Sequence, residues 1–212
     1  MKKRMLMVAC SVMLTLASVA GSLPSALIGQ TTTISEAAKK TTKKTTKKNN
    51  KTNKKNNKKK ATPSASKLAT AVKEAYGENY LPNYQLSAEE IQNLTGVSAD
   101  WCASAYVEQP MISVHIDTLM IFKAKNATAK KKILKKVKAY QAYLIEDTMQ
   151  YPSNQYKIKG STIYTNGNYV CFIMLGQIDL SIEETGDESK IIAAYQAQNK
   201  KAVTAIKKKL KG

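Results

Sequence analysis

Histidine and cysteine are scarce in this 212-residue chain, which contains one His and three Cys. A zinc or iron–sulfur site needs about four such ligands close together. These metal centres and a disulfide-rich scaffold are therefore all but excluded. The sequence also lacks a phosphate-binding glycine loop, a dinucleotide-binding fingerprint and a nucleophile elbow. We therefore expect no metal and no other cofactor.

Arginine occurs once, at Arg4, and every other strongly basic side chain is a lysine. Bidentate recognition of guanine edges or phosphates favours the guanidinium group, so we expect no sequence-specific binding to nucleic acid. The net charge is nevertheless +19 at pH 7. Most of the excess lies in residues 1–60, and a smaller basic stretch occupies residues 190–212. A nearly neutral body therefore carries two cationic ends.

Residues 1–30 have the pattern of a secretory signal peptide. The positive start Lys2-Lys3-Arg4 precedes a nearly unbroken apolar run from Met5 to Ala20, and Gly21 ends the run. Small residues near position 20 and again near position 37 give two candidate cleavage sites, and both stay open. We therefore expect an extracellular or envelope-associated protein.

The N-terminal segment has two alternative interpretations, a lipoprotein signal and an uncleaved membrane anchor, and the second has more support. Cys10 suggests a lipoprotein, but the apolar stretch before it is too short for a lipoprotein signal. The segment Met5–Ile28 could nearly span a bilayer. An uncleaved membrane anchor is therefore the stronger alternative to secretion.

Residues 31–63 form a low-complexity stretch of Lys, Thr and Asn. Between Lys39 and Lys60 there is no aliphatic or aromatic residue, so burial cannot repay the entropy of ordering, and we expect a disordered linker. Its partners would be anionic wall polymers, such as teichoic acids or peptidoglycan carboxylates, or an anionic lipid surface. A merely solvated spacer is equally open. The candidate polyanion-binding residues are Lys47, Lys48, Lys51, Lys54, Lys55, Lys58, Lys59 and Lys60.

Residues 64–212 are predicted to form one small α+β domain. Apolar residues at helical spacing, with Ser, Asn or Thr at the start of each run, predict four helices. A Ser-x-x-Glu capping box introduces the second, and Thr185–Glu188 resembles another before the last. The predicted helices cover residues 64–76, 87–94, 128–148 and 185–210.

Period-two or wholly apolar runs predict the strands. Ile112–Asp117 alternates between apolar and polar residues, Leu119–Lys125 follows it, and Lys157–Thr165 and Tyr169–Leu175 flank Asn166-Gly167. A two-residue turn at Asn166-Gly167 would pair Tyr164 with Tyr169 and Ile163 with Val170. The last strand is apolar on both faces and should be central.

The predicted elements give the order strand–strand–helix twice. We therefore expect an antiparallel sheet of about four strands with helices packed against it.

Four segments resemble, in order, a family known as domain of unknown function 4358. They are Ala71–Asn83, Pro110–Thr118, Met149–Pro152 and Tyr169–Gly176, within a resemblance that runs from about Leu68 to Ile206. The resemblance implies an exported protein of a Gram-positive bacterium. The family brings no established activity, substrate or catalytic residue to transfer.

The sequence offers few candidate catalytic residues. Ser113, His115 and Asp117 would share one face of the alternating strand, which resembles a catalytic triad in composition. Side chains at this spacing stand side by side, roughly 7 Å apart at Cα, whereas a triad needs a bent hydrogen-bonded chain. They are weak catalytic candidates, and a polar strand face or a small binding role is the alternative.

Cys102 and Cys171 remain if a signal peptide is removed, and two cysteines in an exported chain could form a disulfide. Cys171 lies in the predicted core strand, where a free cysteine behaves as a small hydrophobe. The acidic residues between Asp179 and Glu188 lack the ligand spacing of a calcium-binding hand. We expect an ordinary exposed loop there.

These observations favour an exported, non-enzymatic cell-envelope protein. Its cationic linker would associate with anionic wall polymers, and its domain would present a surface to an unknown partner. A membrane-tethered interaction module and an enzyme with an unrecognised site are the alternatives.

Overall fold

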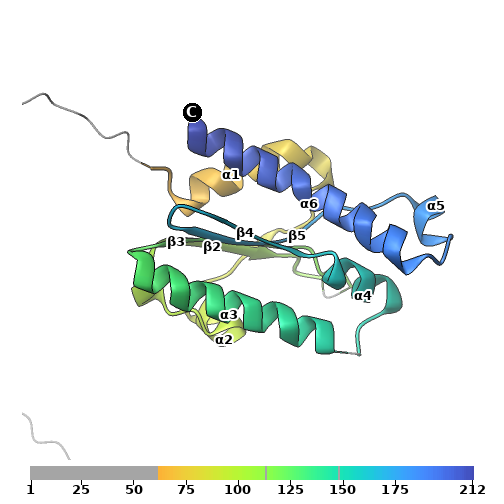
Figure 1. Cartoon of the computed structure of the whole chain (residues 1–212), viewed down its shortest axis with the longest axis horizontal. Coiled ribbons are helices and arrows are strands. Elements are labelled where there is room, and N and C mark those ends of the chain that lie inside the picture. Colours follow the sequence, from red (N-terminus) through yellow and green to blue (C-terminus); the bar gives the residue numbers. More distant parts are fainter. Residues whose placement is uncertain (1–61, 113, 148) are drawn as a thin grey trace, which may run out of the picture. The chain divides into compact units, whose positions relative to one another are not determined.

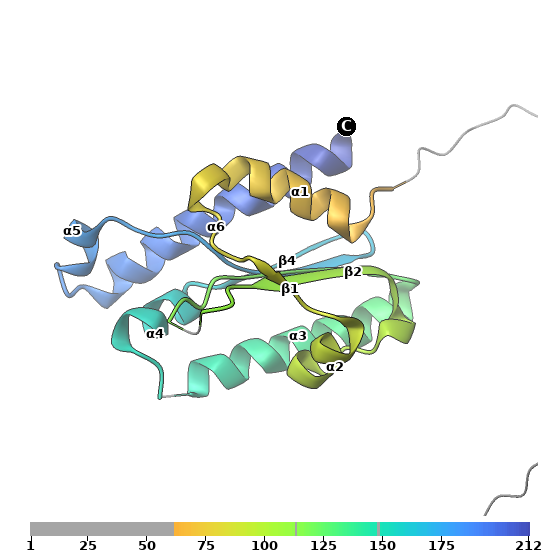
Figure 2. The ribbon, with the colours of Figure 1, turned by 180° about the vertical axis from the view of Figure 1, so that it is seen from behind.

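The computed structural model of the chain describes residues 62–112, 114–147 and 149–212. The signal-peptide pattern, the lysines of the linker and Ser113 lie outside these described residues, so the hypotheses about them stay predictions. The described residues form three layers, in which an antiparallel sheet lies between two layers of helices (Figures 1 and 2).

The central layer is a five-stranded sheet in which every neighbouring pair is antiparallel. This confirms the α+β class and an antiparallel sheet of about the expected size. Two of its strands, Tyr84–Gln85 and Cys102–Gln109, were not predicted, and the expected strand over Ile112–Asp117 is not among the five. Every residue of β5 is buried, as expected for a central strand. In spatial order the strands are β1 (Tyr84–Gln85), β2 (Cys102–Gln109), β3 (Thr118–Ala124), β5 (Tyr169–Met174) and β4 (Thr162–Asn166).

Helices cover both faces of the sheet, and strand alternation divides the core between them. α1 (Ala65–Tyr76) and α6 (Glu188–Lys211) lie on one face, and α2 (Ala88–Thr95) and α3 (Ala127–Glu146) on the other (Figures 1 and 2). Ile121 and Cys171 pack towards α1 and α6. Phe122 and Phe172 pack towards α3. Two apolar layers of similar size therefore hold the sheet.

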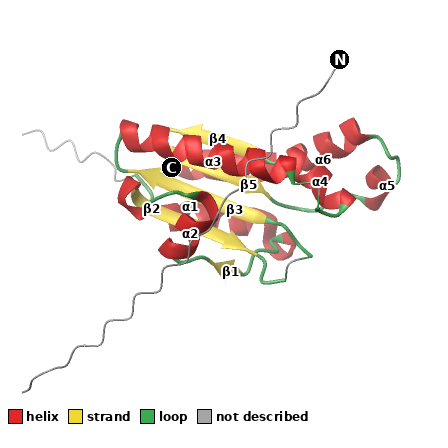
Figure 3. Ribbon diagram, turned by 90° about the horizontal axis from the view of Figure 1, so that it is seen from below, coloured by secondary structure: helices red, strands yellow, loops and turns green. Residues whose placement is uncertain are grey.

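The shorter elements complete the fold. Figure 3 shows α4 (Pro152–Lys159) and α5 (Leu180–Glu183) near the same end of the sheet. Two short 3₁₀ turns, η1 (Gly77–Asn79) and η2 (Ala99–Trp101), follow α1 and α2.

The helix starts follow from their capping residues. The Ser64 hydroxyl accepts a hydrogen bond from the Lys67 amide, and Ser87 and Glu90 form the predicted capping box. At α6 the predicted box from Thr185 is wrong. Asp187 caps this helix instead, accepting from the Ser189 and Lys190 amides, because a carboxylate satisfies two free amides of the first turn.

The predicted strand over Ile112–Asp117 is also wrong. β2 ends at Gln109, and residues 110–117 form a turn-rich connection to β3, here named the β2–β3 loop. Pro110 has no amide hydrogen for the next ladder bond. Of the apolar members of the alternation, Ile112 and Val114 are 63% and 53% exposed, so no layer of the described domain covers them. The third, Ile116, packs against the core on the α3 side.

The segment before the last hairpin also differs from the predicted strand over Lys157–Thr165. Residues from Pro152 to Lys159 form α4, with Pro152 at a position that needs no amide hydrogen, so the strand begins only at Thr162. The hairpin exists, but Asn166 pairs with Tyr169. The two turn residues are therefore Gly167 and Asn168, one step later than predicted, and Gly167 supplies the positive φ of 51°.

Candidate functional site

The structure places two of the three triad candidates, His115 and Asp117, in different surroundings. His115 is exposed in the β2–β3 loop, and its amide donates to the Ile112 carbonyl in a turn. Asp117 is 1% exposed at the start of β3. Ser113 lies outside the described residues. The shared strand face that suggested a triad does not form, because this part of the loop is not a strand.

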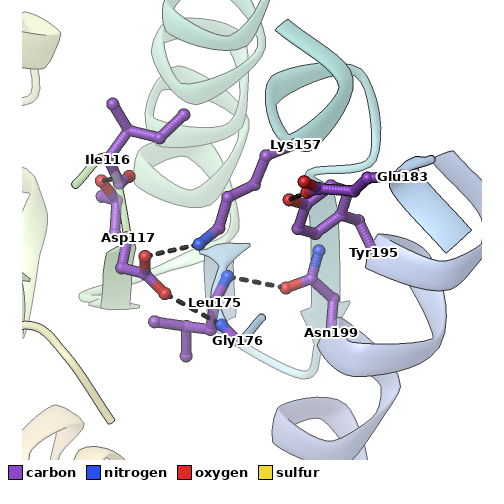
Figure 4. A network of polar contacts seen from close by, with 9 residues as sticks. Ile116, Asp117, Lys157, Leu175, Gly176, Glu183, Tyr195 and Asn199 are labelled. Atoms are coloured by element: carbon purple, nitrogen blue, oxygen red, sulfur yellow. Dashed lines mark hydrogen bonds and ion pairs between the residues drawn. The ribbon is translucent and has the colours of Figure 1, made fainter. Parts of the chain in front are cut away.

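Asp117 instead belongs to a buried ion pair. Its Oδ2 accepts from Lys157 Nζ of α4 at 2.5 Å, and its Oδ1 accepts from the amide of Gly176, just after β5, at 2.9 Å (Figure 4). The Lys157 side chain is only 8% exposed. Both oxygens of the carboxylate are therefore engaged inside the protein, which suits anchoring and leaves no free base directed at a substrate.

Asn199 of α6 continues this network. Its Oδ1 accepts from the Leu175 amide at 2.9 Å (Figure 4). Its Nδ2 donates to the Gly160 carbonyl at 3.0 Å. Gly160 permits a close approach, since a Cβ there would lie 2.7 Å from Tyr195 Cβ. The buried amide thus fastens α6 to the end of β5 and to the turn after α4.

Tyr195 contacts this network through Lys157 and links it to α5 through Glu183. The Lys157 ammonium lies 5.7 Å from its ring centroid, a cation–π distance. Its hydroxyl donates to Glu183 of α5 at 2.8 Å. Burial, followed by the hydrogen bond to Glu183, raises the pKa of Tyr195 well above its usual range. The phenol therefore stays protonated and acts as a donor.

A second polar cluster lies at the other end of the β2–β3 loop. Glu108, 5% exposed at the end of β2, accepts from Lys73 Nζ at 2.8 Å and from the Tyr80 hydroxyl at 2.7 Å. Burial is the largest single influence on Lys73 and lowers its pKa, but the hydrogen bonds and charges of Glu108 and Tyr106 together raise the pKa above its usual value. Burial and the hydrogen bond to Glu108 raise the pKa of Tyr80. Polar clusters thus fix both ends of the loop.

Between these anchors the loop exposes apolar side chains. Met111, Ile112 and Val114, here named the apolar loop residues, are 72%, 63% and 53% exposed. Gln109 hydrogen-bonds Tyr140, which places the end of β2 against the second half of α3. That half of α3 and the chain after it expose further apolar side chains: Tyr143, Ile145, Met149 and Tyr151.

The domain's charges also divide between its two ends. α5, the C-terminal end of α3 and the N-terminal end of α6 lie at one end of the layers (Figures 1 and 2). We name it the acidic end, and its carboxylates are Glu146, Asp147, Asp179, Glu183, Glu184, Asp187 and Glu188. Hydrogen bonds from Ser181 and from Ser189 lower the pKa values of Asp179 and Asp187, the latter to about 2. These two carboxylates are therefore ionised at neutral pH.

The opposite end is basic on both sides of the sheet. The first half of α3 and the second half of α6 meet this end (Figures 1 and 2). Its lysines are Lys130, Lys131, Lys132, Lys135, Lys136 and Lys138 on α3 and Lys200, Lys201, Lys207, Lys208, Lys209 and Lys211 on α6. The described chain starts at this end, because Lys123 Nζ donates to the Thr62 carbonyl and the Tyr169 hydroxyl to the Pro63 carbonyl. We name it the basic end.

The two cysteines do not form the disulfide that the sequence left open. Both are free. Cys171 packs on the α1–α6 side of the sheet, whereas Cys102 contacts the core on the α3 side. Burial raises the pKa of the Cys102 thiol to about 11 and that of Cys171 to about 12. Neither has the thiolate character of a reactive cysteine.

Within the described ranges, three or more potential metal ligands from Asp, Glu, His and Cys do not gather at any one place. In the same ranges no helix combines the length and the apolar character needed to cross a membrane.

Comparison with known families found one match. The model of a family described as a domain of unknown function, DUF4358, matches residues 75–175. Neither the curated proteins nor the solved structures gave a match. The matched range starts at the end of α1 and stops just after β5, so it includes the β2–β3 loop and Lys157 but not α6.

Proposed function

We propose that this chain, whose residues 75–175 match the model of the DUF4358 family, is an exported, non-enzymatic protein of the cell envelope. The description of that family names no activity. In this proposal the lysine-rich stretch associates with anionic wall polymers. The acidic end of the domain, with its exposed apolar side chains, binds a protein partner.

The observation that carries the proposal is the division of the domain into two unlike ends. The lysine-rich stretch before Thr62 leads into the basic end, so attachment there leaves the acidic end accessible. Exposed lysines attract polyanions without recognising a particular sequence of units in the polymer. A chain with one cationic end and one apolar, acidic end is suited to joining two different partners.

The acidic end has the features of a protein-binding surface. Single exposed apolar residues are ordinary, but several gathered at one place and rimmed by polar groups mark an interaction site. Here Met111, Ile112 and Val114 share one loop, and buried polar clusters at Glu108 and Asp117 hold both ends of that loop. A loop fixed before binding loses less entropy on association.

Co-sedimentation with purified cell walls tests the wall-binding part. The full chain is compared with a variant in which Lys47, Lys48, Lys51, Lys54, Lys55, Lys58, Lys59 and Lys60 are changed to Gln, with and without teichoic acids and at low and high salt. We expect the full chain to sediment at low salt and the variant to sediment less. If the amount of sedimented protein does not change with salt, with teichoic-acid removal or with these substitutions, this part is refuted.

Crosslinking in intact cells tests the partner-binding part. A photoreactive residue at position 112 is compared with one at position 94. Leu94 is an exposed apolar residue of α2, outside the β2–β3 loop. We expect a discrete crosslinked product at 112 that Met111→Ser and Val114→Ser together abolish. Equal products at both positions, or none at 112, would contradict the assignment.

The N-terminus of the purified protein distinguishes secretion from anchoring. We expect a mature start near Gly21 or Ala38. An intact mass that retains Met5–Ile28 would instead favour the membrane-tethered alternative.

A further inference from the structure

A groove runs between α1 and α6 at the basic end of the domain. Its volume is about 1310 Å³. Small side chains line part of it, among them Ala71 and Ala75 of α1 and Ala197 and Ala205 of α6. Because these side chains are short, they leave space between the longer side chains of the two helices.

The rim of the groove is cationic. Lys67 of α1 faces Lys200, Lys201, Lys208 and Lys209 of α6 across it, and all five are exposed. Within the described part of the chain, none of these five forms an ion pair; the lysines that do are Lys73, Lys157, Lys159 and Lys190.

One carboxylate, Glu74, also lines the groove, so positive charge dominates by a wide margin. Exposed lysines with no anionic partner in the protein are free to pair with a ligand.

The spacing of the lysines indicates an extended anion. Lys200, Thr204 and Lys208 follow one another at intervals of four residues, so they lie along one face of α6. At 1.5 Å per residue, Lys200 and Lys208 are about 12 Å apart along the helix axis. A single phosphate contacts only one of these lysines at a time, whereas a linear polymer with repeated charges contacts the row.

The groove also connects with the lysine-rich stretch. Thr62 and Pro63 line it, and hydrogen bonds from Lys123 and Tyr169 hold their carbonyls in place. The residues that precede them in the sequence end in Lys58-Lys59-Lys60. A polymer bound in the groove therefore lies beside the point where a further run of lysines joins the domain.

We propose that the α1–α6 groove is a binding site for a linear phosphodiester polymer. This inference rests on the proposed wall association and adds a defined site on the domain to it. The lysine ammonium groups act as point charges that tolerate variation in the polymer's sugar or polyol units. The site lies largely outside the range 75–175 that matches the family.

Binding of the full chain to purified poly(glycerol phosphate), measured at several salt concentrations, tests the inference. The groove variant carries Lys67→Gln, Lys200→Gln and Lys208→Gln. Its matched control carries Lys131→Gln, Lys135→Gln and Lys138→Gln, three exposed lysines of α3 on the opposite layer with the same loss of charge. A third variant has the eight linker lysines, Lys47 to Lys60, changed to Gln as above.

We expect the groove variant to bind roughly tenfold more weakly at low salt and its log–log salt slope to fall by about 2, because it loses three counterion-releasing contacts. The control should change less than twofold, because its lysines lie on α3, on the other face of the sheet, and do not line the groove (Figures 1 and 2). Equal losses in the groove variant and its control would overturn the groove assignment.

The remaining outcomes separate the groove from the proposed function. If the linker variant loses binding and the groove variant does not, the wall association stands and the groove inference fails. If the unchanged chain does not bind the polymer at any salt concentration, both fail. Vesicles containing phosphatidylglycerol form a separate arm: a larger groove-dependent loss on vesicles than on the polymer would assign the groove to lipid head groups and refute the polymer.

Discussion

Replacing Asp117 by Asn tests whether the buried ion pair stabilises the domain and holds the β2–β3 loop. The substitution keeps the size of the side chain and an oxygen for the Gly176 amide, but it removes the negative charge beside Lys157. The Lys157 side chain is 8% exposed, and Asp117 is its one carboxylate partner among the residues that the structure describes. An ammonium group left without its partner in such a place is poorly compensated by water.

Removing one partner of a buried pair typically costs about 3–5 kcal/mol, and we expect Asp117→Asn to lie in this range. The chain offers a matched control, because Lys159 and Glu188 form an ion pair at the same distance of 2.5 Å with side chains that are 38% and 53% exposed. Exposed pairs contribute about 0–1 kcal/mol, so Glu188→Gln should change the free energy of unfolding little. Burial alone distinguishes the two pairs.

Urea unfolding at pH 7 measures both variants against the unchanged chain. With a urea m-value of about 2 kcal/mol per molar, Asp117→Asn should lower the midpoint by about 1.5–2.5 M. The double variant Asp117→Asn, Lys157→Met should recover much of the loss, because it removes both buried charges and keeps an oxygen for the Gly176 amide. An Asp117→Asn variant within 1 kcal/mol of the unchanged chain, or no different from Glu188→Gln, would refute the reasoning.

Three further predictions follow from the core. Burial raises the pKa values of Tyr76, Tyr80 and Tyr195, and that of Tyr140 to about 12, so the folded state keeps protons that the unfolded chain loses above pH 10. The urea midpoint should be steady below pH 10 and fall as the pH rises towards 12, and Tyr140→Phe should flatten that fall; a flat profile would contradict this. In a Cys10→Ser chain, a thiol reagent should modify Cys102 and Cys171 readily only in denaturant, and any native disulfide between them would contradict their placement on opposite faces. Gly160→Ala should cost about 1–3 kcal/mol in the same urea assay, because its Cβ would lie 2.7 Å from Tyr195 Cβ; an unchanged midpoint would show that the two segments separate easily.

Much of the architecture could be predicted because its signals are local. The helical spacing of Leu68, Val72 and Tyr76, and of Ile133 and Val137, marks the buried faces of α1 and α3. A continuous apolar run marks the central strand β5. Such patterns report which side chains avoid water, and avoiding water is the property that assigns elements to layers.

The polar clusters could not be predicted, because they join residues far apart in the chain. Lys157 pairs with Asp117 at a separation of 40 residues, and Asp117 reaches Gly176 at 59. No spacing rule links such positions. Asp117 was singled out on a different argument, as a member of a triad on one strand. The one available signal was Asn199, a polar residue at a core-facing position of α6 between Tyr195 and Ala202; a buried amide there requires partners, and it has them.

The failure at the β2–β3 loop bears on function. Alternation of apolar and polar residues predicts a strand because one face is expected to be covered. Here the alternation is present, and Ile116 packs against the core on the α3 side, but neither helix layer covers Ile112 or Val114. The Asp117–Lys157 pair at one end of the loop is buried on both sides, whereas at the other end the buried Glu108 pairs with a Lys73 that is 39% exposed. Buried charges are costly unless they are paired. A loop that is held at both ends and leaves two apolar side chains uncovered is the arrangement that the proposed partner-binding role requires.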